Sequence, residues 1–150
     1  DFDTGKITGE QFYAGLREHF TVHLSYESFK RNWNEIFRVN QGMPELLEKL
    51  KAKGYRLFLL SNTNELHFPY CQNTFGFLKI FDEFLLSYKL GIRKPSPEIF
   101  QKLKSYSNNE IIFIDDIMDN VVAAQKEGID AIRFTSREEL EDIFRKKRII

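Results

Sequence analysis

One stretch, residues 111–116, constrains the fold of this 150-residue chain more than any other. Four apolar residues, Ile111-Ile112-Phe113-Ile114, run directly into two adjacent carboxylates, Asp115 and Asp116. An apolar run of this length is typical of a strand that is buried on both faces of a parallel sheet. The carboxyl end of such a strand is where open α/β sheets bind ligands. The two acids therefore either bind a hard cation such as magnesium, or they are solvated loop residues of which one caps the next helix.

Strand and helix patterns alternate from residue 42 onward, which predicts an α/β fold. Gly42 and Pro44 mark the start of a short helix, and Gly54 is placed to end it. Helices between successive strands imply right-handed crossovers and hence a parallel sheet. We expect strands at residues 55–60, 84–87, 111–114 and 131–134, and helices at residues 65–75, 97–106 and 117–127 and after Ser136.

Residues 1–41 follow a different pattern, which predicts a helical hairpin. Thr8 and Gln11 have the spacing of a capping box, and Ser25 is placed to cap a second helix. Apolar residues recur at helical spacing and predict the faces on which the helices pack: Phe12, Leu16, Phe20, Phe29, Trp33, Ile36 and Phe37. We therefore expect two domains, a helical one at residues 1–41 and an α/β one at residues 42–150.

Composition and charge narrow the class of protein. The 22 basic and 22 acidic residues give a net charge of zero, which argues against nucleic acid or an anionic membrane as the main partner. No stretch reaches the roughly 18 apolar residues of a membrane span. Cys71 is the one cysteine of the sequence, so no disulfide forms within the chain, and we expect a reducing compartment, the cytoplasm.

Polar side chains follow three of the predicted strands. Ser61-Asn62-Thr63-Asn64 follows the first, Lys94 lies in a proline-rich loop after the second, and Asp115-Asp116 ends the third. The first cluster suits a phosphate group or is a plain helix cap, and Lys94 either neutralises a phosphate or is an ordinary surface lysine. Because parallel strands bring their carboxyl ends to one edge, the three clusters together suit metal-assisted phosphoryl transfer.

In this order and at these spacings, the clusters resemble motifs II, III and IV of the haloacid dehalogenase-like hydrolases. The matching segments are Leu-Leu-Ser-Asn-Thr-Asn at residues 59–64, Gly-Ile-Arg-Lys-Pro-Ser-Pro-Glu-Ile-Phe at 91–100 and Ile-Phe-Ile-Asp-Asp-Ile-Met-Asp-Asn at 112–120. Residues 2–12 are similar to the start of the helical cap in that family. The resemblance is nearest to bacterial sugar-phosphate phosphatases and the phosphatase domain of soluble epoxide hydrolase. It implies a three-layer core around a parallel sheet of the Rossmann-like type, with a small helical cap.

The resemblance implies a phosphate-binding role for three residues. Ser61 would hydrogen-bond the phosphoryl oxygens, and Asn62 would lie beside it. Lys94 would stabilise both the nucleophile and the transferring phosphoryl group. Ser61 and Lys94 are accordingly the catalytic residues that we expect within this chain.

The resemblance also implies a Mg²⁺ site. Asp116 would bind the ion directly, and Asp115 would bind it through a water molecule. Asn120, which stands where the family frequently has Asp, would support these ligands from behind. The replacement lowers the negative charge around the ion by one.

The family further requires a buried strand that ends in Asp-x-Asp, whose first Asp is the nucleophile. Asp1-Phe2-Asp3 imitates that motif, but no apolar strand precedes it, and the residues after it fit the start of a helix better. We therefore expect the nucleophile and its central strand to lie upstream of residue 1 and the 150-residue chain alone to be inactive. Without that strand, the sheet has a slot between residues 55–60 and 111–114.

One hypothesis leads and three alternatives remain. We expect the parent protein to be a magnesium-dependent phosphatase of small phosphorylated metabolites that forms an aspartyl-phosphate intermediate. The alternatives are a non-catalytic fragment that acts as a binding or structural module, a dehalogenase, and a phosphorelay receiver domain. Dehalogenase chemistry is typical of those members of the family that lack the Asp-Asp pair, which this sequence has. Receiver domains place their acids before the hydroxyl and the lysine, so both fit this sequence less well.

Overall fold

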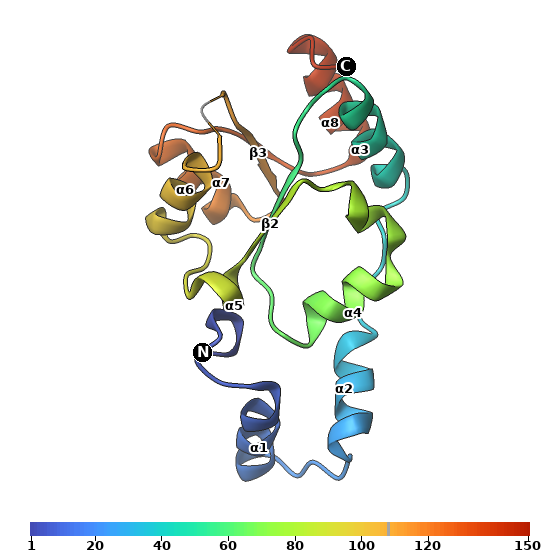
Figure 1. Cartoon of the computed structure of the whole chain (residues 1–150), viewed down its shortest axis with the longest axis vertical. Helices are drawn as coiled ribbons and strands as arrows, with labels where there is room; N and C mark the ends of the chain where they lie inside the picture. The colour runs from blue at the N-terminus through green and yellow to red at the C-terminus, as the bar shows by residue number, and fades with distance from the viewer. Residues whose placement is uncertain (108) are drawn as a thin grey trace. The chain divides into compact units, whose positions relative to one another are not determined.

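The computed structural model describes residues 1–107 and 109–150 (Figure 1). These residues form two compact units, each built from two segments of the chain. The first unit comprises Asp1–Val39 and Phe58–Arg93, and the second comprises Asn40–Leu57 and Lys94–Ile150. The expected division into domains at residues 1–41 and 42–150 stays a prediction.

The first unit combines a helical pair with a two-stranded parallel ladder. Strand β1 (Phe58–Ser61) pairs with β2 (Glu83–Leu86), and Ser61 at the end of β1 lies opposite Leu86. The helices and 3₁₀ turns of this unit are η1 (Phe2–Thr4), α1 (Gly9–His19), α2 (Tyr26–Asn34), α4 (His67–Thr74), η2 (Gly76–Ile80) and α5 (Ser87–Leu90).

The second unit contains the other parallel ladder. Strand β3 (Ile112–Asp115) pairs with β4 (Asp130–Arg133), so that Asp115 lies opposite Arg133. Its helices are α3 (Met43–Ala52), α6 (Pro97–Lys104), α7 (Met118–Lys126) and α8 (Arg137–Lys146). Phe100 of α6 makes an edge-on contact with Phe113 of β3, with ring centroids 5.3 Å apart, and both side chains are buried.

The parallel α/β class predicted from the sequence is confirmed, with shorter strands than expected. Strand β1 begins at Phe58 rather than at residue 55, because the backbone N–H of Tyr55 still donates to the Leu50 carbonyl at the end of α3. Within the described part of the chain, residues 55–60 form no ladder with residues 111–114. The slot between them stays a prediction.

The helix starts follow the predicted capping residues. Thr8 and Gln11 form a complete capping box on α1, and the Ser25 hydroxyl accepts from the Ser28 amide at the start of α2. The prediction for the end of α2 was wrong, because this helix stops at Asn34 and leaves Ile36 62% exposed.

Aromatic side chains make the core between α1 and α2. Phe12 stacks on Phe2 and also contacts Phe29 and Trp33, with ring centroids 4.7, 6.2 and 5.1 Å away, respectively. Phe29 is buried and stacks on Trp33 at 5.5 Å. The helical pair therefore has an apolar core of its own, as the sequence predicted, but Phe20 does not belong to it, because α1 ends at His19 and Phe20 is 66% exposed.

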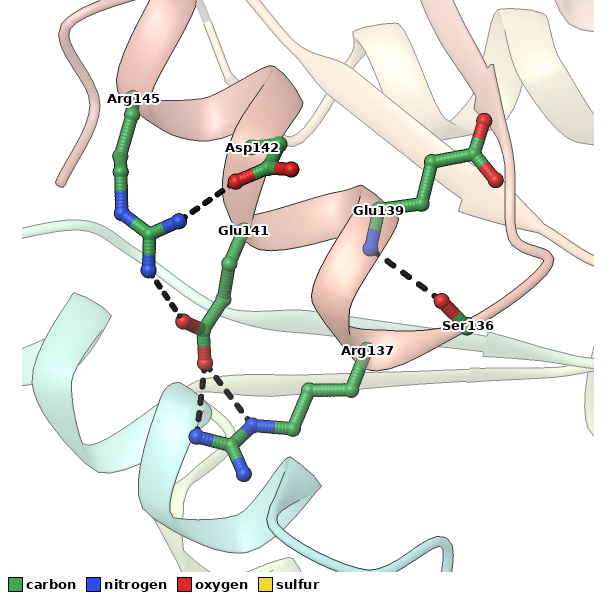
Figure 2. Close-up of polar contacts among 6 residues, drawn as sticks. All are labelled: Ser136, Arg137, Glu139, Glu141, Asp142 and Arg145. Carbon is green, nitrogen blue, oxygen red and sulfur yellow. Dashed lines mark hydrogen bonds and ion pairs between the residues drawn. The ribbon is translucent and has the colours of Figure 1, made fainter.

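Helix α8 shows how surface charge is arranged on the second unit (Figure 2). Ser136 accepts from the Glu139 amide at the start of this helix, at 3.2 Å. Glu141 accepts from Arg137 and from Arg145, at 2.8 and 2.7 Å. Pairs of this i,i+4 type on a helix surface each stabilise the helix by only about 0.3–0.5 kcal/mol. None of the helices in residues 1–107 and 109–150 is both long enough and apolar enough to cross a bilayer.

Gly5 provides a test of how η1 packs in the first unit. Its φ is +68°, and a Cβ there would lie 2.2 Å from the backbone oxygen of Tyr88. Gly91 in the same unit has a similar φ of +72° but open space around it. We expect Gly91→Ala to cost about 1–2 kcal/mol of unfolding free energy from backbone strain, and Gly5→Ala to cost about 1–3 kcal/mol more from the clash.

Urea unfolding of both variants, followed by circular dichroism, measures this difference. Equal losses for the two substitutions would contradict the close packing of Gly5 against Tyr88.

Candidate active site

A hydroxyl from the first residue of α5 holds the loop after β1. Ser87, directly after β2, is fully buried, and its Oγ accepts from the Thr63 amide and donates to the Thr63 carbonyl, both at 2.9 Å. One side chain thus satisfies both backbone groups of Thr63 and fixes the path of the chain beyond Ser61. Ser61 and Asn62 are half-buried at this strand end.

Asn64 is the helix cap within this loop. Its Oδ1 accepts from the amides of Leu66 and His67, at 3.2 and 3.0 Å, at the start of α4. Of the two roles considered for residues 61–64, the helix cap therefore applies to Asn64. The hydroxyl of Ser61 and the amide of Asn62 are separate from that cap, and their binding roles stay predictions.

Lys94 and Asp115 form a buried ion pair in the second unit. The Lys94 Nζ lies 2.6 Å from Asp115 Oδ2, and the two side chains are only 10% and 5% exposed. The Lys94 Nζ also lies 5.5 Å from the ring centroid of Phe113. The alternative of an ordinary surface lysine is therefore wrong, because burial of a lysine is rare unless it has a partner such as this carboxylate.

Three donors converge on the Asp115 carboxylate. Besides Lys94, the Asn120 side-chain amide and the Ile117 backbone amide donate to Oδ1, at 3.0 and 2.9 Å. Burial alone would raise the pKa of Asp115, but these three hydrogen bonds and the Lys94 charge lower it below its usual value. Asp115 is therefore a fixed negative charge at the end of β3.

The acids at the end of β3 differ in their surroundings. Asp116 is exposed, and its carboxylate makes no hydrogen bond or ion pair that the structure records within residues 1–107 and 109–150. A carboxylate offers about four acceptor positions, so the three donors on Asp115 leave about one. Carboxylate oxygens such as these are suitable ligands for Mg²⁺. The described residues contain no group of three or more His, Cys, Asp or Glu side chains that could hold a metal, so the pair would supply only part of a site.

The Asp1-Phe2-Asp3 segment is not the end of a strand. Residues 2–4 form the 3₁₀ turn η1, and Asp3 Oδ1 accepts from the Asn64 side chain at 3.2 Å. Its carboxylate is thus part of the packing around the loop after β1. This arrangement agrees with the sequence-based rejection of the segment as the nucleophile motif.

The structure brings together some of the predicted site residues. Asp115 contacts both Lys94 and Asn120 in the second unit, and Asp116 directly follows Asp115 in the chain. Ser61 and Asn62 belong to the first unit. Sequence reasoning missed Ser87 as the residue that holds the loop. The sequence placed Ser87 at the end of the predicted strand 84–87 but gave no local signal of its contact with Thr63.

Comparison with known proteins identifies the family that this chain matches and several similar proteins. A family model described as a haloacid dehalogenase-like hydrolase matches residues 8–128. The chain is similar to the sesquiterpene phosphatase astK of Aspergillus oryzae, with 28% identity over 89% of this chain and 70% of the relative. It is equally similar, at 28% identity, to a D-ribitol-5-phosphate phosphatase of Bacteroides thetaiotaomicron, over 89% of this chain and 69% of the relative.

A solved structure supports the same fold. It is that of a wild-type HAD-family enzyme from Bacteroides thetaiotaomicron, in complex with magnesium and inorganic phosphate. The TM-score is 0.83 at 31% identity, over 95% of this chain and 77% of the other. The fold expected from the sequence is thereby confirmed.

The ion pair between Lys94 and Asp115 can be tested by a double-mutant cycle. We expect Lys94→Met alone to cost about 3–5 kcal/mol of unfolding free energy, because it leaves a buried carboxylate without its cation. Lys94→Met combined with Asp115→Leu should cost less than the sum of the two single changes. Urea unfolding of the four proteins gives the coupling energy.

The matched control is the ion pair of Lys147 and Asp130 in the same unit. Its atoms are 2.7 Å apart, but its side chains are 40% and 49% exposed. Its coupling energy should stay below about 1 kcal/mol. A Lys94–Asp115 coupling no larger than this control would show that burial adds nothing to the pair.

Proposed function

This chain belongs to the haloacid dehalogenase-like hydrolases, and from that premise we propose that its parent protein is a magnesium-dependent phosphatase of small phosphorylated compounds. The main support for this proposal is one observation. A buried lysine is paired with the carboxylate at the end of a parallel strand, where α/β enzymes bind their ligands. A buried cation that is already oriented suits a phosphoryl group, because no reorganisation is needed when the anion arrives.

The phosphate-binding residues in this proposal are Ser61, Asn62 and Lys94. Lys94 neutralises charge on the transferring phosphoryl group as a compact ammonium ion. Ser61 donates its hydroxyl proton to a phosphoryl oxygen, and Asn62 binds beside it. The Ser87 clamp on Thr63 supports this role, because it keeps the backbone next to Ser61 and Asn62 in one conformation.

The metal-binding residues in this proposal are Asp116 as a direct ligand and Asp115 through water, with Asn120 behind them. Bound Mg²⁺ supplies Lewis-acid polarisation of the phosphoryl group and neutralises its charge. Asn120 keeps the Asp115 carboxylate oriented through its 3.0 Å hydrogen bond. The exposed carboxylate of Asp116 supports its assignment as the direct ligand.

The nucleophile belongs to a segment outside residues 1–150. Asp3 lies in a 3₁₀ turn and is engaged with Asn64, which supports this assignment. An upstream aspartate would attack phosphorus and displace the alcohol of the ester, which leaves with a proton, and water would then hydrolyse the aspartyl-phosphate to inorganic phosphate and free aspartate. The helical pair α1–α2 acts as the cap that selects the substrate, and the cytoplasm suits a chain whose cysteine is a free thiol.

The relatives suggest the substrate class. Two are named as a sesquiterpene phosphatase and a D-ribitol-5-phosphate phosphatase, and others are named as phosphoglycolate phosphatases. The phosphate ester is common to all of these, whereas the organic part differs. We therefore assign a small phosphorylated metabolite, with the choice among such compounds made by the cap.

Phosphatase assays on the longest natural form of the protein test this proposal. With para-nitrophenyl phosphate, ribitol 5-phosphate or phosphoglycolate as substrate, we expect turnover with Mg²⁺ and none with excess chelator. Ser61→Ala and Lys94→Met should each lower kcat/KM by about 10²–10³-fold, whereas surface Lys147→Met should have no effect.

The 150-residue chain is the second arm of this test. We expect it to bind inorganic phosphate in the presence of Mg²⁺, in a manner that depends on Lys94, but not to release phosphate from an ester. Turnover by this chain alone would contradict the assignment of an outside nucleophile. Absence of turnover in the longer protein would favour a non-catalytic binding module.

A further inference from the structure

A buried polar network joins the loop after β1 to the helical pair within the first unit. Asn64 is at its centre and is only 2% exposed. Its Nδ2 lies 3.2 Å from Asp3 Oδ1 and 3.2 Å from His67 Nδ1, while its Oδ1 accepts from the amides of Leu66 and His67. The side-chain amide therefore uses both of its donors and its acceptor.

The orientation of the Asn64 amide follows from its partners. Oδ1 must face the two backbone N–H groups, because they only donate, and Nδ2 must face the Asp3 carboxylate, which accepts when ionised. The same Nδ2 then donates to His67 Nδ1. That ring nitrogen must be an acceptor and carries no proton.

The second ring nitrogen of His67 completes the assignment. Nε2 lies 3.0 Å from the backbone oxygen of Trp33, in α2. A carbonyl oxygen can only accept, so Nε2 carries the proton. The hydrogen bonds on both sides of the ring thus require the neutral imidazole with its proton on Nε2.

Two aromatic rings enclose His67. It stacks on Trp33, with centroids 5.3 Å apart and planes 16° apart, and it meets the edge of Phe37 at 4.8 Å. Burial lowers the pKa of His67 below its ordinary value of 6.5, although the Trp33 carbonyl and the Asp3 charge act in the opposite direction. Asp3, on η1, is the charged group that acts on this ring among the described residues.

His67 therefore contacts two parts of the first unit at once. Its Nε2 is hydrogen-bonded to the backbone oxygen of Trp33, near the end of α2. Its Nδ1 is hydrogen-bonded to Asn64, the last residue of the loop that begins at Ser61. We propose that neutral His67 is a positioning residue that holds the Ser61–Asn64 loop against helix α2, and that protonation of its ring releases Asn64. The loop is the proposed phosphate-binding loop, so the consequence for catalysis rests on the proposed function.

Protonation acts through a conflict of donors. With a proton on Nδ1, His67 and the Asn64 amide would present N–H groups to each other, and the amide has no orientation that keeps its other partners. If it turned over, Oδ1 would face Nδ1, but Nδ2 would then face the Leu66 and His67 amides, which cannot accept. The cap on α4 or the bond to Asp3 is lost in either case.

The sign of the pH dependence follows from the lowered pKa. The folded chain holds the neutral ring, so the contribution to stability is complete above the ordinary pKa of 6.5. It declines as the pH falls below 6.5 and through the lower folded value, because the unfolded chain binds the proton first. The loop should therefore be best ordered at neutral and alkaline pH.

Trp33 makes the titration directly visible. It is the one tryptophan of the sequence and stacks on His67, and a protonated imidazole quenches the fluorescence of an indole in contact with it. As the pH is lowered, we expect the Trp33 fluorescence of the 150-residue chain to fall in a step that corresponds to the binding of one proton. The midpoint of this step should lie below pH 6.5. His67→Phe, which keeps a stacked ring without nitrogens, should abolish the step.

The matched control removes the other histidines. The sequence has three, His19, His23 and His67, so the double variant His19→Gln, His23→Gln leaves only the ring in question. Its fluorescence step should match that of the unmodified chain. This control also answers the question independently of whether His67→Phe folds.

Loop release is measured by NMR in the same samples. The side-chain amide of Asn64 and the backbone amides of Asn62 and Thr63 should shift with the midpoint of the fluorescence step, and His67→Phe should remove that shift. A step in fluorescence with no response of these amides would reduce His67 to a packing contact and overturn the proposal. Absence of any step would overturn the proposed release of Asn64, because the ring would then not change its protonation state as the pH falls.

The final arm separates this inference from the proposed function. Binding of inorganic phosphate with Mg²⁺ should weaken across the same pH step in the unmodified chain and should lose this pH dependence in His67→Phe. Optical and NMR steps as expected, without phosphate binding at any pH, would reject the proposed function and leave the positioning role of His67 intact. A phosphate affinity that does not change across the pH range of the fluorescence step would contradict the link between His67 and the loop.

Discussion

The buried pair of Lys94 and Asp115 is the interaction on which the rest of the second unit depends. Two charges that are 10% and 5% exposed are tolerated in a fold only when they are paired and hydrogen-bonded. The end of β3 and the start of α7 supply the remaining donors, from Ile117 and Asn120. A strand end, a helix start and the loop that carries Lys94 are thereby held in one arrangement. The same arrangement leaves Asp116 exposed beside an ionised carboxylate that is paired with a lysine.

In the first unit, the buried polar groups of the loop after β1 are paired mainly with neutral partners. Ser87 satisfies both backbone groups of Thr63, and Asn64 satisfies the start of α4 while it binds Asp3 and His67. Thr63, Asn64 and Ser87 are buried, and an unpaired polar group there would cost about 1–3 kcal/mol. The loop after β1 is therefore held by specific hydrogen bonds rather than by apolar packing. Such a loop can keep a fixed shape and still present Ser61 and Asn62 to a ligand.

The sequence predicted much of this architecture because its signals are local. Strand ends with polar clusters, the Thr8 capping box and the Ser136 cap each depend on residues a few positions apart, and the structure confirms them. The end of α2 was less predictable, because apolar spacing continues past Asn34 although the helix does not. Contacts between distant residues carried no local signal. Asn64 and Asp3 are 61 positions apart, and Ser87 and Thr63 are 24 apart.

A crystal structure of the longest natural form of the protein with Mg²⁺ and a phosphate analogue such as vanadate tests the central assignment most directly. We expect the metal to be bound by Asp116 and an oxygen of the analogue to accept hydrogen bonds from the Lys94 ammonium and the Ser61 hydroxyl. Lys94 should remain paired with Asp115 in that complex. A metal bound away from Asp116, or an analogue that contacts neither Lys94 nor Ser61, would contradict the roles proposed for these residues in phosphoryl transfer.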